Sequence, residues 1–208
     1  MAWIKTIAFE DAVGKLKSIY NRVKGPDGNV DNILMAHSLR PHSLEGHMTL
    51  YKYVLHHPSN TLPKWLLEAV GVYVSLLNKC HYCVSHHQEG LSRLLRDDSK
   101  AVEIRKALEK HKPSLASSHL TERDIAALDY AKILTVAPES VTLLSLDELR
   151  AKGLDDGEIL EVNQVVAYFA YANRTVLGLG VNTDGDFIGL SPTAKPGSRD
   201  NPDDWSHA

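Results

Sequence analysis

Apolar residues recur at helical spacing along most of the chain. In residues 9–23 they fall three or four positions apart, which places them on one face of a helix. The same pattern predicts further helices over residues 31–38, 43–55, 63–77, 80–95, 99–108, 121–135, 145–153 and 156–178, separated by segments rich in proline, glycine and capping residues. The chain is therefore predicted to fold as a succession of helices.

The predicted helix that begins at Pro63 differs from the others because it is apolar on nearly every side. This pattern is typical of a helix buried on several faces. Glu68 lies within it, and a buried carboxylate costs several kcal/mol unless a hydrogen bond or an opposite charge compensates. Glu68 therefore predicts a basic group nearby. The alternative is that Glu68 lies on the solvent side of the helix start.

The length and composition of the chain indicate its domain organisation. With 208 residues and 43% hydrophobic content, the protein is expected to form one domain over residues 1–188, built as a single unit or as two closely packed halves. Residues 189–208 are rich in Pro, Gly, Ser and Asp and are expected to form an extended or partly disordered tail.

The charge and hydropathy patterns argue against two classes of partner. The net charge is −3, the pI is near 6.4, and Lys and Arg are scattered, so nucleic acid is not an expected partner. No uncharged apolar run approaches about 18 residues, and the N-terminus lacks the apolar core of a secretory signal, so no membrane partner is expected. We expect a cytoplasmic protein.

Both cysteines of the chain lie close together, as Cys80-x-x-Cys83, and His87 follows. On a helix these three side chains share one face. In a reducing compartment this spacing is typical of a redox-active or metal-binding site rather than of a structural disulfide.

The thiol chemistry needs a group that removes a proton, because the thiolate is the nucleophile and a free cysteine is mostly protonated at neutral pH. If Asn78 caps a helix, Cys80 lies in its first turn, where the helix dipole favours a thiolate. His87 instead stands one turn after Cys83 and can accept its proton, with Glu68 as the carboxylate that orients the ring. One straight helix would separate Glu68 from Cys80 by roughly 18 Å. The chain must therefore turn back near residues 78–79.

A weak internal similarity links the two halves of the chain. Glu68 and Glu161 both follow leucine, and the residues twelve positions after them are Cys80 and Asn173. If this is a true repeat, both copies form related helical hairpins and only the first carries thiols. A chance likeness between two amphipathic helices is the alternative. Asn173 and Arg174 are expected to serve as structural contacts between the halves.

The pattern E-x11-C-x2-C-x3-H resembles the active-site pattern of the alkyl hydroperoxidase D (AhpD) type, within the carboxymuconolactone decarboxylase-like superfamily. Glu68, Cys80, Cys83 and His87 occupy its positions, and the segments NKCHYCVSHH, SLRPHSLEGH and LDYAKILT resemble peroxidase-related proteins of that group. The resemblance covers residues 9–185. It implies an all-α fold and a homo-oligomer, a trimer or a hexamer, with the thiol site at the N-terminal end of a buried helix.

The resemblance also implies a peroxidase mechanism without a cofactor or a metal. Cys83 would attack a hydroperoxide and become a sulfenic acid, and Cys80 would donate a proton and then form a disulfide with it. Glu68 and His87 would relay the proton, and an external dithiol or disulfide reductase would restore the thiols. One position departs from the family, where a histidine precedes the second cysteine. This chain has Tyr82 there and His81 one place earlier, so both are auxiliary candidates.

Other interpretations of the same residues stay open. Glu68, Cys80, Cys83 and His87 could instead hold zinc, or the thiols could exchange disulfides without any peroxide. Decarboxylases and lactone-processing relatives generally lack the C-x-x-C pair, which argues against that chemistry. Several further polar and aromatic side chains could line the site, although such residues are more often core residues or solvated neighbours. They are Arg40, His42, His47, Tyr51, Tyr53 and His86.

Overall fold

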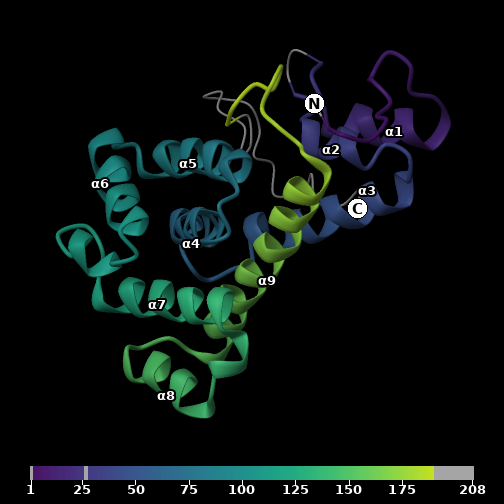
Figure 1. Ribbon diagram of the computed structural model, residues 1–208. Coiled ribbons are helices and arrows are strands. Elements are labelled where there is room, and N and C mark those ends of the chain that lie inside the picture. The colour runs from purple at the N-terminus through teal and green to yellow at the C-terminus, as the bar shows by residue number, and fades with distance from the viewer. Residues whose placement is uncertain (1, 26–27, 190–208) are drawn as a thin grey trace.

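The computed structural model describes residues 2–25 and 28–189, in which helices are joined by loops and turns (Figure 1). The α-helices are α1 (Gly14–Val23), α2 (Asn32–Ala36), α3 (Pro41–Tyr51), α4 (Lys64–Leu77), α5 (His81–Leu95), α6 (Asp98–Glu109), α7 (Glu122–Val136), α8 (Leu143–Ala151) and α9 (Asp156–Leu179). A π-helical segment, Lys52–His56, extends α3, and short 3₁₀ helices cover Pro113–Ala116 and Pro138–Ser140. The described ranges contain no β-strand, so the predicted all-α fold class is confirmed. The predicted tail lies outside them except for Gly189.

Helix α4 occupies the centre of the fold. Figure 1 shows it nearly end-on, with α5, α6, α7 and α9 arranged around it, and these helices all contact it. Every residue from Leu66 to Ser75 is buried, Glu68 included. The all-round apolar pattern of this helix therefore reflects packing on several faces, as its sequence predicts.

Local sequence signals fix several helix ends. Helices α7 and α9 begin with capping boxes, formed by Thr121 with Asp124 and by Asp155 with Glu158. Each box satisfies amide groups that a helix start leaves without partners. Helix α9 ends at Leu179, and the next residue, Gly180, has a φ of +61°, a left-handed conformation that glycine adopts without strain.

Three predicted helix starts are wrong, and one of them is that of α8, which begins at Leu143 with Thr142 as its cap rather than at Ser145. The first helix begins at Gly14 rather than at Phe9, and Phe9 packs on Tyr20 from a turn, with ring centroids 6.4 Å apart. Pro41 is the first residue of α3 rather than a break before it, because proline fits the first turn of a helix. Ser43, expected as the cap, lies inside α3, where its hydroxyl donates to the carbonyl of Arg40.

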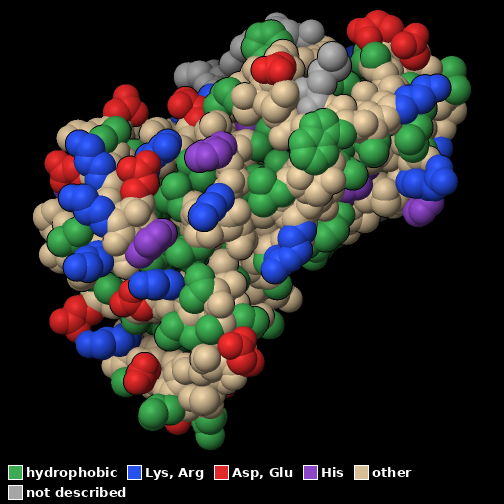
Figure 2. All heavy atoms as spheres, in the orientation of Figure 1, with side chains coloured by type: hydrophobic (Ala, Val, Ile, Leu, Met, Phe, Trp, Pro, Cys, Tyr) green, Lys and Arg blue, Asp and Glu red, His purple; other side chains and the backbone are tan. Residues whose placement is uncertain are grey.

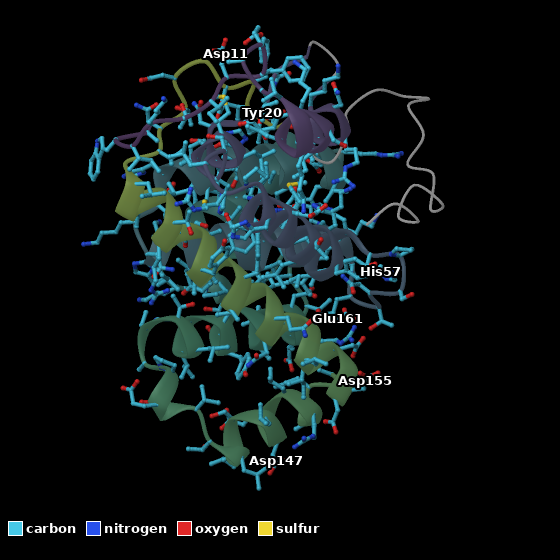
Figure 3. The ribbon with its side chains drawn as sticks, turned by 90° about the vertical axis from the view of Figure 1, so that its right-hand side faces the viewer. Asp11, Tyr20, His57, Asp147, Asp155 and Glu161 are labelled. Carbon is cyan, nitrogen blue, oxygen red and sulfur yellow. The ribbon has the colours of Figure 1, made fainter. Side chains whose placement is uncertain are left out.

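The second copy of the internal similarity does not form a hairpin. Helix α9 continues without a break past Asn173, whereas the chain breaks after α4 before Cys80. The matched glutamates also differ in role. Glu161, labelled on α9 in Figure 3, accepts the backbone amides of Thr61 and Leu62 at 2.8 and 2.9 Å and fixes the chain before α4. The expectation of two related hairpins is therefore wrong.

The close approach of α4 to α9 depends on Gly71. A Cβ atom at this position would lie 2.2 Å from two ring atoms of Phe169, whose side chain is fully buried. We expect Gly71→Ala to lower the free energy of unfolding by about 1–3 kcal/mol, because the ring has no free space to move into. Gly46→Ala is the matched control, since nothing lies within 4 Å of its added Cβ. Urea unfolding measures both, and a Gly71→Ala protein as stable as the parent would contradict this packing.

The surface carries no basic stripe on the face shown in Figure 2, where Lys and Arg are interspersed with Asp and Glu. In the part of the chain that the structure describes, every helix is too short or too polar to cross a lipid bilayer.

Candidate active site

The chain reverses between α4 and α5, at the position that the sequence predicts. Helix α4 ends at Leu77, Lys79 adopts a φ of +59°, and α5 starts at His81. The amide of Cys80 donates to the carbonyl of Ser75 at 2.8 Å, which closes the turn. This reversal places the motif of α5 beside the buried glutamate of α4.

The two cysteines differ in their place on α5. Cys80 is the residue that caps the helix start, and Cys83 lies in the first turn. The sequence-based expectation that Cys80 lies inside the first turn is therefore wrong, because the helix starts at His81 and Asn78 belongs to the end of α4. At the helix start, the backbone amide of Cys83 donates to the Cys80 thiol, so negative charge is favoured on Cys80.

Glu68 and His87 form a buried pair between α4 and α5. The Nδ1 atom of His87 lies 2.7 Å from Oε2 of Glu68, and the Glu68 side chain is only 1% exposed. This excludes the solvent-facing alternative for Glu68 and supplies the basic partner that its burial predicts. His56, from the π-helical segment, approaches the other oxygen, with Nε2 4.0 Å from Oε1. With Nδ1–H directed at the carboxylate, Nε2 of His87 is the nitrogen that can accept a proton.

Both thiols are free and buried, and they share a hydrogen bond. This bond lowers the pKa of Cys80, helped by the backbone amide of Cys83. The same bond, together with burial, raises the pKa of Cys83 well above its usual value. The first proton lost by the pair therefore leaves Cys80, and Cys83 donates to the Cys80 thiolate. Sequence reasoning favoured direct ionisation of Cys83 through His87. In the structure, the negative charge forms first on the sulfur of Cys80.

Asn173 of α9 is a site residue that sequence reasoning treated only as a structural contact. Its side chain is fully buried and hydrogen-bonds to both thiols, which lowers the pKa of each. Its Oδ1 accepts from Asn78 at 3.0 Å, and its Nδ2 donates to Ser75 at 3.1 Å. The turn that carries Cys80 is thus fixed from both sides by one amide. One sequence feature could have indicated this role, because Asn173 aligns with Cys80 in the weak internal similarity.

We expect Asn173→Ala to move the pH profile of thiol alkylation upward by about one unit, because a hydrogen bond to a charged group is worth about 1.5–3 kcal/mol. Asn163→Ala is the control on the same helix, since Asn163 donates to Tyr130 instead. Iodoacetamide rates measured between pH 5 and 10 test this. An unchanged profile for Asn173→Ala would exclude Asn173 from stabilising the thiolate.

A cavity of about 110 Å³ opens above the thiols, between α2, α3, α5 and α9. Cys83 and His87 line it, whereas Cys80 does not. Tyr51 and His47 also line it, which favours the alternative that they border the site over a purely core role. Tyr53, by contrast, is 46% exposed and lies outside the cavity lining.

The auxiliary candidates Tyr82 and His81 do not extend the Glu68–His87 pair. The hydroxyl of Tyr82 donates to Asp186 at 2.7 Å and accepts the amide of Ile33 at 3.2 Å. It therefore fixes the segment after α9 against α2 and α5. His86 lines the cavity with its Nε2 3.4 Å from the same carboxylate. His81 is exposed at the start of α5.

The described residues provide no arrangement for a metal ion. Within them, no three His, Cys, Asp or Glu side chains are grouped so that they could hold one. The zinc interpretation of Glu68, Cys80, Cys83 and His87 therefore has no ligand set in this structure.

The fold was compared with known proteins. No protein-family model matches the sequence, and neither does any curated protein sequence. Solved structures do match. A peroxidase-related protein from Ralstonia eutropha JMP134, described as an alkylhydroperoxidase AhpD core, superimposes with a TM-score of 0.75 over 87% of this chain and 91% of its own, at 19% identity. The chain has the AhpD-like fold.

Two further structures share the AhpD-like fold. An uncharacterized peroxidase-related protein from Silicibacter sp. TM1040 is 24% identical, with a TM-score of 0.68 over 80% of this chain and 83% of its own. The debrominase Bmp8 is 20% identical, with a TM-score of 0.67 over 85% of this chain and 89% of its own. A cysteine-to-alanine variant of Bmp8 is known in complex with 2,3,4-tribromopyrrole.

Proposed function

We propose that the protein is an AhpD-like, thiol-dependent peroxidase that reduces organic hydroperoxides. The observation that carries the proposal is the buried carboxylate–imidazole pair of Glu68 and His87 beside two free thiols, one of which faces a cavity. Catalytic nucleophiles are typically activated by an adjacent base that a third group orients, and this site contains each of these parts. The AhpD-like fold and the peroxidase-related neighbours agree with this chemistry.

The first half of the reaction oxidises Cys83. His87 accepts one proton from the thiol pair, and the Cys83 proton moves to the Cys80 thiolate as the substrate enters. The Cys83 thiolate then attacks the terminal oxygen of the hydroperoxide, so the O–O bond breaks and an S–O bond forms. Cys80 donates its proton to the leaving alkoxide, which departs as an alcohol. Cys83 is then a sulfenic acid.

The second half forms the disulfide. The Cys80 thiolate attacks the sulfur of Cys83, the S–O bond breaks, and the leaving hydroxide takes a proton from His87 and departs as water. The net reaction transfers two electrons from the thiols to the peroxide. An external dithiol or disulfide reductase then restores both thiols by exchange. A reducing compartment such as the cytoplasm would supply this reductant. The same compartment would keep both cysteines as free thiols, as they are in this structure.

The test is consumption of cumene hydroperoxide by the protein with dithiothreitol as reductant. We expect many turnovers per protein chain, with one dithiothreitol oxidised for each hydroperoxide. No consumption by folded protein that retains both free thiols would overturn the proposal. Disulfide exchange with an oxidised dithiol, under the same conditions and without peroxide loss, would favour a thiol–disulfide oxidoreductase instead.

A second candidate is reductive removal of a halogen from a small ring. It is favoured by the shared fold of the debrominase Bmp8 and by the small cavity beside Cys83. In this reaction a C–H bond replaces a C–Br bond, bromide is released, and the thiol pair is oxidised to a disulfide. Bromide release from 2,3,4-tribromopyrrole in the presence of dithiothreitol distinguishes it from the peroxidase.

We also propose that the protein forms a homo-oligomer, a trimer or a hexamer, with no nucleic-acid or membrane partner. Large apolar side chains are exposed on α7, α8 and α9, and a second copy of the chain would cover them. They are Val136, Leu143, Leu144 and Leu160, each at least half exposed. Light scattering coupled to size-exclusion chromatography measures the assembly, and a monomer mass would contradict the proposal.

A further inference from the structure

We infer that the cavity above Cys83 selects a neutral substrate that carries a single small ring, and that His47 hydrogen-bonds to the polar group of that substrate. The inference rests on the peroxidase function proposed above and specifies its substrate class. It follows from three properties of the cavity lining: size, charge, and one buried polar atom without a partner.

The size and the shape of the cavity suit one ring. Its volume of about 110 Å³ is below that of an enclosed protein cavity of roughly 150 Å³ that binds benzene, but this cavity is open at one side, so one ring can enter it. Aromatic side chains form one wall, where Tyr168 lies 5.8 Å from both Tyr51 and His47, measured between ring centroids. Aromatic rings pack favourably at 4.5–7 Å in tilted arrangements. The ring of a ligand would pack against these aromatic side chains, whereas a long acyl chain would exceed the volume of the cavity.

The charge of the lining disfavours an anionic substrate. Among the described residues that line the cavity there is no lysine or arginine, and the His86 and His87 imidazoles in the lining already act on the Asp31 carboxylate. Asp31 lines it too, and burial raises its pKa, an effect that His86 opposes and the Asp186 carboxylate adds to. A second anion in the same small cavity would meet both desolvation and like-charge repulsion. A neutral hydroperoxide avoids both costs.

His47 supplies a hydrogen-bonding group inside the aromatic wall. Its side chain is 4% exposed, and its Nδ1 atom is buried without a hydrogen-bond partner. Burial, together with the adjacent His37, lowers the pKa of His47 to about 3, so the ring is neutral at physiological pH. A neutral imidazole donates through one nitrogen and accepts through the other. Leaving such an atom unpaired costs about 1–3 kcal/mol, and the hydroxyl or hydroperoxyl group of a ligand would remove that cost.

The test compares three hydroperoxides that differ in one feature each. Cumene hydroperoxide is neutral and carries a ring, tert-butyl hydroperoxide has a methyl group in place of the ring, and 4-carboxycumene hydroperoxide adds a carboxylate. We expect kcat/KM for cumene hydroperoxide to exceed both others by at least about tenfold, the discrimination that a shaped apolar pocket provides. Equal kcat/KM values for the three would overturn the inference and leave the peroxidase function standing.

Variants of one residue test the hydrogen bond. His47→Phe keeps the ring shape without its nitrogens, and we expect it to lower kcat/KM for cumene hydroperoxide about tenfold. His47→Gln, which restores a donor and an acceptor, should recover most of that loss. His42→Ala, an exposed histidine on the same helix, is the control and should match the parent. A His47→Phe protein as active as the parent would overturn the role of His47.

A binding measurement separates this inference from the peroxidase function. Cumyl alcohol, the neutral product of cumene hydroperoxide, should slow iodoacetamide alkylation of Cys83, located by peptide mass spectrometry, in the parent and in His42→Ala. It should not do so in His47→Phe, and 4-carboxycumyl alcohol should not do so in any of them. Protection without reduction of any hydroperoxide would support the ring-binding cavity and overturn the peroxidase. Absence of protection by cumyl alcohol, with peroxide reduction intact, would overturn the cavity inference alone.

Discussion

Replacing Cys83 by serine is expected to abolish hydroperoxide reduction, with a loss in kcat/KM of at least about 10³-fold, because serine lacks a nucleophile that ionises near neutral pH. Cys83 is the thiol that lines the cavity, so it is the one that a substrate oxygen can reach. The variant should also fail to form an adduct with dimedone, a reagent for sulfenic acids, after exposure to cumene hydroperoxide.

Cys80→Ser is the matched control for this prediction. We expect it to consume one hydroperoxide per chain and then to stop, with a lasting sulfenic acid on Cys83, because the thiol that completes the disulfide is missing. The lowered pKa of Cys80 makes the reverse assignment a real alternative. If Cys80→Ser showed no first turnover and Cys83→Ser formed a sulfenic acid on Cys80, the two roles would have to be exchanged.

Replacing Glu68 by glutamine is expected to reduce thiolate formation near pH 7 by about 10²-fold, the lower end of what a general base contributes. The glutamine keeps the shape of the side chain but removes the negative charge 2.7 Å from the His87 ring. His87 then loses the partner that stabilises its protonated form, so the alkylation profile of the thiols should move to higher pH. The assay is the iodoacetamide rate of each cysteine as a function of pH.

Stability and a control variant separate a catalytic role of Glu68 from a structural one. The glutamine can still accept Nδ1–H of His87 through its amide oxygen, and Oε1 of Glu68 has no hydrogen bond to lose, so the free energy of unfolding should change by less than about 1 kcal/mol. Glu148→Gln, on exposed α8, should leave both activity and stability unchanged. An alkylation profile of Glu68→Gln identical to that of the parent would remove Glu68 from the proton relay.

Much of the site follows from local sequence rules. The helical spacing of Cys83 and His87, the isolated Glu68 in an apolar helix, and the length of that helix together predict a reversal and a buried acid–base pair. These inferences succeed because each depends on the chemistry of a few residues close in sequence.

The parts that sequence reasoning missed depend on contacts between distant segments. Asn173 lies on α9 and reaches the thiols only because α9 packs against α4 through Gly71 and Phe169. His47 lines the cavity because the face that α3 turns inward is set by its packing, and aromatic residues at helical spacing otherwise suggest a core. Tyr82 pairs with Asp186, which lies 104 positions later in the chain. No periodicity or spacing rule connects such pairs.

Intact-protein mass spectrometry after one equivalent of cumene hydroperoxide tests whether the peroxide oxidises the two thiols to a disulfide. We expect a mass lower by two hydrogen atoms, no added oxygen, and no remaining thiol, which together mean a Cys80–Cys83 disulfide. The mass should return to that of the reduced chain after dithiothreitol. An unchanged mass with the peroxide still present, or a retained oxygen with both thiols still alkylatable, would contradict this expectation.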